Sequence, residues 1–186
     1  MNIKHFYRVV LDELHKAERS IDESAFSQLQ TILRDSHHIY VTGKGRSGLV
    51  ASTFANRLLH LGFSVSVLGE ITSPHTSEQD SLIVISGSGK TETLIPIIKK
   101  AHKKDLKTVL ITMNEKSEMS MFADLVIYIP GLSPKVLKKT EVQSIQPMGS
   151  LFEQTAFLFL DSFIIELMNE LNIDENMMYL HHADLE

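Results

Sequence analysis

The chain has 186 residues, 43% of them hydrophobic, and a formal net charge of −5 from 18 basic and 23 acidic side chains. This length allows one substantial core and is short for two full domains, so we expect a single domain over residues 1–186. Acidic and basic residues are scattered along the chain, which argues against a nucleic-acid partner. The absence of cysteine excludes disulfides and thiolate chemistry, and it is typical of a reducing compartment, so we expect a cytoplasmic protein.

The apolar segments predict neither export nor a membrane partner. The N-terminus lacks the apolar stretch and the small-residue cleavage site of a secretory signal. The longest apolar run, residues 151–168, is interrupted by Glu153, Gln154, Asp161 and Glu166. We therefore expect this run to form a helix that is buried in the protein or at an interface.

Apolar periodicity predicts two helices within residues 1–36. Apolar side chains recur at helical spacing over residues 3–17 and again over residues 26–33. Between them, the segment Ser20-Ile21-Asp22-Glu23 has the pattern of a capping box.

Five short apolar or β-branched runs follow within residues 37–130, separated by turns and helix-like stretches. Such alternation favours an α/β fold with a parallel sheet covered on both faces. The expected strands lie near His38–Thr42, Ser64–Leu68, Leu82–Ser86, Thr108–Thr112 and Leu125–Ile129. The expected helices are Ser47–Leu61, Thr91–Lys103 and Ser117–Ala123. Pro96 is expected to bend the second of these helices.

The remaining chain predicts a loop followed by a helix and a tail. Residues 131–147 are polar and turn-rich, with the basic side chains Lys135, Lys138 and Lys139, and they predict a mobile loop near the carboxyl edge of the sheet. Residues 148–186 predict a long helix that is apolar on more than one face, and then a tail. One sheet face cannot cover so much apolar surface, which favours a homo-oligomer.

Two turns rich in glycine and serine each follow a strand-like run and precede a helix-like run. They are Gly43-Lys44-Gly45-Arg46-Ser47-Gly48 and Ser86-Gly87-Ser88-Gly89-Lys90-Thr91. The start of a helix offers unpaired N–H groups and a partial positive charge, which suit an anion such as phosphate. Two such turns, with hydroxyl side chains that donate further hydrogen bonds, predict a phosphorylated small molecule held between them.

Each turn also has other interpretations. The first matches the dinucleotide-binding pattern G-x-G-x-x-G, with Glu70 as the candidate ribose-binding acid. However, Glu70 lies farther along than the typical ~20 residues, and this interpretation gives the second turn no role. The second turn is not a P-loop, because Val84 stands where that pattern requires glycine. For both turns, the alternative that they are tight turns and helix caps without a ligand stays open.

The pattern Ser86-Gly87-Ser88-Gly89-x-Thr91-x-Thr93 resembles the phosphosugar signature of sugar isomerase (SIS) domains. Four further segments are similar to the 6-phospho-3-hexuloisomerase family: Gly45–Ala51, Arg57–Gly62, Pro147–Glu153 and His182–Glu186. The resemblance implies a flavodoxin-like three-layer α/β sandwich, in which helices flank a five-stranded parallel sheet. It also implies a homo-oligomer, with a tetramer favoured over a dimer, whose active sites lie at subunit boundaries.

The same resemblance implies an enzyme with a sugar-phosphate substrate and no cofactor. Members of the family interconvert a 3-hexulose 6-phosphate and fructose 6-phosphate through an enediol. They act beside a synthase that condenses formaldehyde with ribulose 5-phosphate. The alternative is a non-catalytic module that binds a sugar phosphate, and such a module needs the two turns but no catalytic side chains.

Two catalytic residues are expected from the resemblance. Glu153 matches the glutamate that acts as the base, and His182 matches a histidine that assists ring opening or proton movement, often at a neighbouring subunit's site. His181 stands where the family more usually has arginine, so which histidine acts stays open. From the residues alone, Ser150-x-x-Glu153 also has the pattern of a capping box, and a histidine in a tail is commonly exposed.

The substrate-binding residues are expected in the two turns: Gly45, Arg46, Ser47, Ser86, Gly87, Ser88 and Thr91. The Arg46 guanidinium suits sugar hydroxyls, an enediolate or phosphate, unless it simply faces solvent. Gly48 is expected to let a helix pack closely on a strand. Lys90 departs from the acidic or small residue that the family resemblance implies at this position of the second turn. The histidines lack the spacing of metal ligands, so no metal site is expected.

Overall fold

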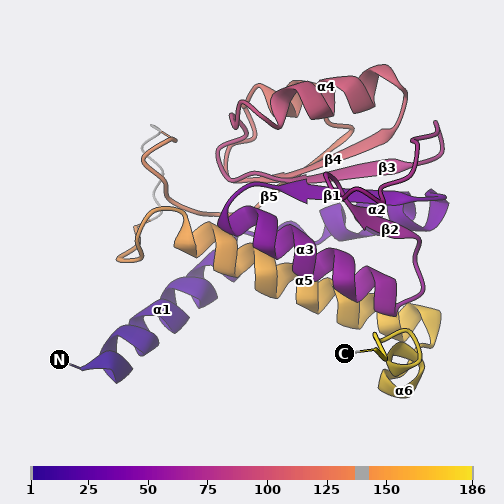
Figure 1. Ribbon diagram of the computed structural model, residues 1–186. Coiled ribbons are helices and arrows are strands. Elements are labelled where there is room, and N and C mark those ends of the chain that lie inside the picture. Colours follow the sequence, from indigo (N-terminus) through magenta and orange to yellow (C-terminus); the bar gives the residue numbers. More distant parts are fainter. Residues whose placement is uncertain (1, 137–142, 186) are drawn as a thin grey trace.

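The computed structural model describes residues 2–136 and 143–185, which form a five-stranded parallel sheet with helices on both faces (Figure 1). The strand order is β2-β1-β3-β4-β5. The strands are β1 (Ile39–Gly43), β2 (Val65–Val67), β3 (Ser81–Ile85), β4 (Lys107–Thr112) and β5 (Leu125–Tyr128). The predicted α/β class, parallel sheet and three-layer arrangement are confirmed.

The helices divide between the two faces of the sheet (Figure 1). One face is covered by α4 (Ile95–Lys103) and the short 3₁₀ helix η1 (Met119–Phe122). The other face is covered by α2 (Ser24–Asp35), α3 (Arg46–His60) and α5 (Ser150–Leu171). Helix α1 (Ile3–Glu18) contacts α5 and extends beyond the sheet, and α6 (Glu175–Tyr179) follows α5.

Consecutive strand residues point into different cores. Val41 and Ile83 join the larger core with α2, α3 and α5, whereas their neighbours Tyr40 and Leu82 join the smaller core with α4. All four side chains are buried. Strands buried on both faces read as continuous apolar runs, which is why the pattern of the sequence located them.

Several local predictions at helix ends are wrong. Helix α2 begins at Ser24, and the expected capping box before it does not form; instead Asp22 accepts hydrogen bonds from the Ser24 N–H and Oγ, each at 2.9 Å. Helix α4 begins at Ile95 rather than Thr91. Pro96 therefore lies in the first turn, where its missing N–H costs no helical hydrogen bond, and does not bend the interior. The short helix α6 was not predicted.

The order of the strands places two loop regions at one point of the sheet. From β1 the chain crosses to β2 on one side and then returns to β3 on the other side of β1. Gly43 at the end of β1 is in register with Ile85 at the end of β3. Open parallel sheets bind ligands outside the carboxyl ends of the strands at such a reversal. The two glycine- and serine-rich turns start there.

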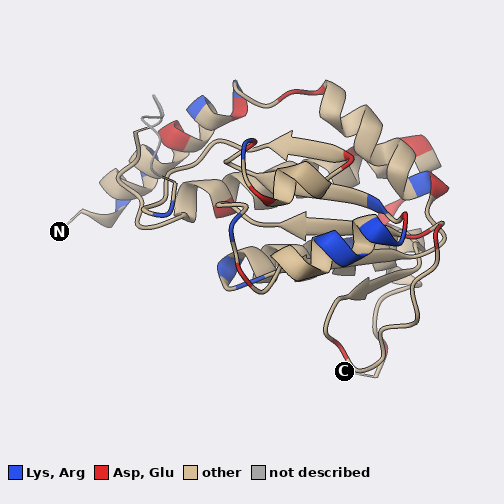
Figure 2. Cartoon of the chain, turned by 90° about the horizontal axis from the view of Figure 1, so that it is seen from above, with Lys and Arg blue, Asp and Glu red and all other residues tan. Residues whose placement is uncertain are grey.

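The surface carries both signs of charge. Lysines lie along the outer side of α4, while acidic residues are dispersed among the other elements (Figure 2). Within residues 2–136 and 143–185, none of the helices is both long and apolar enough to span a bilayer.

The C-terminal tail packs against the end of α3. The Nδ1 atom of His181 lies 3.0 Å from the carbonyl oxygen of His60, and the ring centroids of His60 and His182 are 5.2 Å apart. Burial lowers the pKa of His60, and the nearby charges of Arg57, His182 and His181 lower it further. His60 is therefore held neutral in the folded protein over a range of pH in which an unfolded histidine takes up a proton.

This burial predicts a loss of stability in mild acid. Below the unfolded pKa of ~6.5, the histidine binds a proton in the unfolded state, whereas His60 in the folded state stays neutral. The free energy of unfolding therefore falls as the pH drops, by up to ~1.4 kcal/mol per pH unit, until the pH passes the lowered pKa of folded His60. We expect the free energy of unfolding of His60→Asn to fall less between pH 7 and pH 5 than that of the wild type. Urea denaturation measures it, with the exposed His75→Asn as control. Equal slopes would contradict this assignment.

Candidate active site at the carboxyl edge of the sheet

The first turn leaves the start of α3 open. Gly45 is the N-cap residue with φ 59° and ψ −138°, a conformation that strongly favours glycine. No side chain caps this helix, so the N–H groups of Arg46 and Ser47 remain available to a ligand, whereas the Gly48 N–H donates to the Gly45 carbonyl at 3.0 Å. A Cβ on Gly48 would lie 3.0 Å from the carbonyl oxygen of Gly43. The prediction that Gly48 allows close packing of helix on strand is thus confirmed.

The second turn is fixed by the end of the neighbouring strand β4. The Thr112 hydroxyl donates to the Gly87 carbonyl at 3.0 Å, and the Asn114 side-chain amide donates to the Ser88 carbonyl at 3.0 Å. The Met113 N–H also donates to Gly87, at 3.1 Å. These three consecutive residues hold the turn from outside it, and sequence reasoning missed them. Their only signal was that they lie at the end of the next expected strand or directly after it.

The hydroxyl groups of the second turn line the site. Ser86 and Ser88 are buried, with 3% and 9% of their surface exposed. The Ser86 Oγ lies 3.3 Å from the Thr91 Oγ1, and the Ser88 Oγ accepts a hydrogen bond from the Lys90 N–H at 3.2 Å. The Lys90 side chain is exposed and does not line the cavity. Of this turn, the two serines and Thr91 therefore supply the side-chain donors.

Both turns line one cavity of about 320 Å³ between β1, β3 and the start of α5. The structure brings these predicted residues together around it: Gly45, Arg46, Ser47, Ser86, Gly87, Ser88, Thr91 and Glu153. Further lining residues that were not predicted as site residues include Lys44, Met113, Ser133, Lys135, Met148 and Phe152. Lys138 and Lys139 of the expected loop lie outside the described residues.

An ion pair joins two residues that line this cavity. The Arg46 Nε donates to the Glu153 Oε2, joining the first residue of α3 to the first turn of α5. The Glu153 side chain is 15% exposed, whereas that of Arg46 is 63% exposed. The N-cap of α5 is Gly149, and no side chain caps that helix, so the possible capping box of Ser150 and Glu153 does not form. The Glu153 carboxylate therefore lines the cavity while it is paired with Arg46, not with its own helix start.

The charges around the cavity suit an anionic ligand. Its lining includes three basic residues, Lys44, Arg46 and Lys135, and one acidic residue, Glu153. The hydroxyls of the second turn and the open N–H groups at the start of α3 add uncharged donors beside them. This is the donor set expected of a phosphate site, with a carboxylate at its edge.

The structure does not bring His182 to this cavity within one chain. His182 packs near His60 at the end of α3, whereas Arg46 begins the same helix. A helix of 15 residues spans about 20 Å. His182 and Glu153 therefore lie at opposite ends of α3. The other candidate, His181, lies at the same end as His182.

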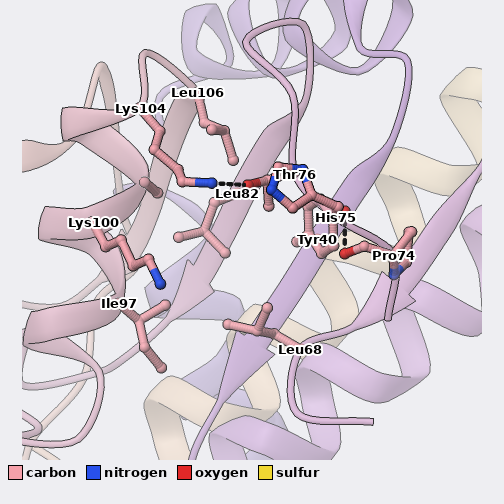
Figure 3. Close-up of a pocket in the computed structure, with 11 residues that line it drawn as sticks. Tyr40, Leu68, Pro74, His75, Thr76, Leu82, Ile97, Lys100, Lys104 and Leu106 are labelled. Carbon is pink, nitrogen blue, oxygen red and sulfur yellow. Dashed lines mark hydrogen bonds between the residues drawn. The ribbon is translucent and has the colours of Figure 1, made fainter. Parts of the chain in front are cut away.

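A second cavity, of about 400 Å³, lies on the α4 face of the sheet (Figure 3). Its walls are mainly apolar, and two pairs of its polar groups are hydrogen-bonded: the Lys104 Nζ donates to the Thr76 Oγ1 at 2.9 Å, and the Tyr40 hydroxyl donates to the Pro74 carbonyl at 3.1 Å. His75 and Lys100 also line it. None of the predicted site residues lines it. Neither of the two glycine- and serine-rich turns contributes to its wall.

The described residues do not support a dinucleotide site or a metal site. Glu70, the candidate ribose-binding acid, is exposed beyond β2 and does not line the cavity between the turns. In the part of the chain that the structure describes, no cluster of three His, Asp or Glu side chains could hold a metal ion.

Comparison with known proteins identifies the family. The model of the SIS domain matches residues 32–157, a range that contains both turns and Glu153. The chain belongs to the SIS domain family. Within it, the 3-hexulose-6-phosphate isomerase of Bacillus subtilis is 41% identical, with 100% of each chain aligned. That of Methylomonas aminofaciens is 35% identical over 97% of this chain and 98% of the relative.

A solved SIS structure is similarly close. A protein from Methanococcus jannaschii, whose crystal structure infers a molecular function of 3-hexulose-6-phosphate isomerase, superposes with a TM-score of 0.82. It is 35% identical and the match covers 98% of this chain and 99% of that protein. The resemblance seen in the sequence is confirmed.

The packing around Gly87 predicts that a side chain there must displace Met113 or Phe152 in this SIS site. A Cβ on Gly87 would lie 2.6 Å from the Met113 Cε and 3.0 Å from the Phe152 Cδ1. We expect Gly87→Ala to displace the turn and to weaken binding of inorganic phosphate about tenfold or more, as one or two lost hydrogen bonds would. Isothermal titration calorimetry measures the affinity, and circular dichroism confirms folding. A folded variant with unchanged affinity would contradict this account of the turn.

Proposed function

We propose that this chain is a 3-hexulose-6-phosphate isomerase, which interconverts a 3-hexulose 6-phosphate and fructose 6-phosphate. One observation carries the proposal: the two phosphate-binding turns and the Glu153 carboxylate line the same cavity. Relatives of that name, 41% and 35% identical over nearly the whole chain, support it. The proposed setting is the cytoplasm, beside a synthase that joins formaldehyde to ribulose 5-phosphate.

In this proposal the turns bind the phosphate and thereby orient the sugar. The hydroxyls of Ser86, Ser88 and Thr91 donate to phosphate oxygens, together with the N–H groups at the start of α3. Lys44 and Lys135 offset the two negative charges of the phosphate. A substrate fixed at its phosphate end places its carbonyl carbons at a set distance from the turns, which is how binding at a remote group assists reaction.

The Glu153 carboxylate then transfers one proton between neighbouring carbons. It removes the proton from carbon 2 of the 3-hexulose, and the proton of the carbon 2 hydroxyl passes to the oxygen on carbon 3 within the enediol. Glu153 then returns the first proton to carbon 3 as carbon 2 becomes the carbonyl. No external oxidant or reductant enters this balance. The Arg46 guanidinium, paired with Glu153, is placed to donate to the oxygen that becomes negative in between.

This role predicts that Glu153→Gln abolishes isomerisation but keeps substrate binding. The amide has the shape of the carboxylate and cannot take up the proton, so we expect kcat to fall about 10²–10⁴-fold while the affinity for fructose 6-phosphate changes little. A coupled assay and calorimetry measure the two quantities. In D₂O, wild-type product should carry deuterium at carbon 3 to the extent that protonated Glu153 exchanges with solvent before it returns the proton.

The opposite results are equally definite. Full turnover by Glu153→Gln would remove this residue from the role of base. A wild-type protein that binds sugar phosphates without converting them would instead be the non-catalytic module.

We further propose a homo-oligomer whose subunit boundary lies beside the active site. A groove of about 430 Å³ between α1, α3 and α5 shares Arg46 and Glu153 with the cavity. It is lined by apolar side chains that are widely exposed in one chain, such as Tyr7 at 66%, Leu49 at 68% and Leu158 at 49%. Apolar surface of this kind is typical of a protein–protein contact, and a second copy of the chain would cover it.

The same arrangement explains how His182 could act. Its own α3 holds it about 20 Å from Glu153, so we propose that His182 assists the reaction at a neighbouring subunit's cavity. Each site then needs Glu153 from one subunit and His182 from another.

Mixing two inactive variants tests this shared site. Glu153→Gln and His182→Ala subunits, unfolded together and refolded as a 1:1 mixture, should restore about a quarter of the sites, because each intact site combines one residue from each variant. The measurement is turnover per subunit, with each variant refolded alone as control. Activity no greater than the sum of the two separate variants would contradict a site shared between subunits.

A further inference from the structure

Glu13 of α1 lies outside the cavity and contacts the chain segment that leads into it. Its side chain is buried, with 9% of the residue exposed. Its Oε2 accepts hydrogen bonds from the Ser144 Oγ at 2.7 Å and the Gln146 Nε2 at 2.9 Å, and its Oε1 accepts one from the Ile145 N–H at 2.8 Å. One carboxylate therefore fixes three consecutive residues that are distant in sequence.

The fixed segment continues directly into the wall of the active site. Gln146 is followed by Pro147, and then by Met148 and Gly149, which line the cavity. Met148 has φ 56°, a backbone conformation that a residue with a side chain adopts only at a cost. Such a conformation persists where the chain on both sides is held.

The two sides of Met148 are held by different elements. After it, the Ser150 N–H donates to the Pro147 carbonyl at 3.1 Å and begins α5. Before it, the three hydrogen bonds to Glu13 hold residues 144–146. The Glu153 carboxylate lies one turn into α5, so its position depends on where this helix start is placed.

The charge of Glu13 strengthens these contacts. Burial opposes the charge, but the hydrogen bonds from Ser144, Ile145 and Gln146 outweigh it and, with the nearby Lys16, lower the pKa of Glu13 below its ordinary value. The group is thus a carboxylate at neutral pH, and hydrogen bonds to an ionised acceptor are stronger than those between neutral groups.

We propose that Glu13 is a positioning residue for the active site, which sets the backbone of residues 144–149 and through it the start of α5. This role rests on the proposed isomerase function, and Glu13 itself touches no substrate. Helix α1 also lines the groove proposed as the subunit boundary, through Tyr7, Val10, Leu11 and Leu14. Glu13 therefore links that boundary to the cavity wall.

The test compares Glu13→Gln and Glu13→Ala with Asp12→Asn, which removes an exposed carboxylate one residue earlier on the same helix. Hydrogen–deuterium exchange of the peptide covering residues 143–149 reports the segment directly, because the Ile145 N–H is one of the bonded groups. We expect exchange to be about tenfold faster or more in both Glu13 variants, with kcat lowered about tenfold or more and KM changed less than about threefold. Asp12→Asn should match the wild type.

A double-mutant cycle separates positioning from general destabilisation. Gln146→Ala removes one partner of Glu13, so its effect on kcat should largely disappear when Glu13 is already alanine. Independent, additive losses in log kcat would overturn the proposal. If Glu13→Ala does not fold, Glu13→Gln with Gln146→Ala gives the same cycle.

The remaining outcomes are distinguishable. Unchanged exchange in the Glu13 variants would overturn the proposal, and so would faster exchange with unchanged kcat in an active protein. A wild type without isomerase activity would overturn the proposed function alone, because the exchange measurement would still decide whether Glu13 holds the segment.

Discussion

The pairing of β1 with β3 in a parallel register determines where everything else at the site lies. Gly43 and Ile85 are partners at the carboxyl ends of these strands, so the turns that leave them must lie side by side. Each turn leads toward a helix on a different face of the sheet, which separates them enough to leave a cavity rather than a packed core. A phosphate-sized anion can then meet donors from both turns at once.

Besides the two turns, the start of α5 forms part of the cavity wall, although it is distant in sequence. Helix α5 packs beside α3, and the Arg46–Glu153 ion pair joins their first turns. This contact directs a carboxylate toward a cavity whose other charged groups are basic, which gives the site two chemically distinct ends. A phosphate and a group that donates a carbon-bound proton need such a division, because the former requires donors and the latter an acceptor.

The parts of the site that the sequence could predict are those whose signal is local. Both turns carry their glycines and hydroxyls within six residues, and Glu153 follows a recognisable Pro-Met-Gly segment. Thr112 and Asn114 act on the second turn from another strand, and no local pattern marks such a partner. The Ser150-x-x-Glu153 pattern was ambiguous for the same reason, since only the folded chain brings Arg46 close enough to pair with the Glu153 carboxylate. The start of α4 was misjudged because threonine and proline are compatible with both a turn and a first helical turn.

The uncapped start of α3 has a consequence for the protein without a ligand. N–H groups that stay unpaired until a ligand binds do not stabilise the ligand-free protein. The start of α3 therefore lowers the stability of the fold when no ligand is present. Whatever anion occupies it adds its own binding free energy to the folded state by mass action. The abundance of that metabolite would then influence how long each molecule escapes unfolding and proteolysis, which ties the lifetime of the protein to the supply of its ligand.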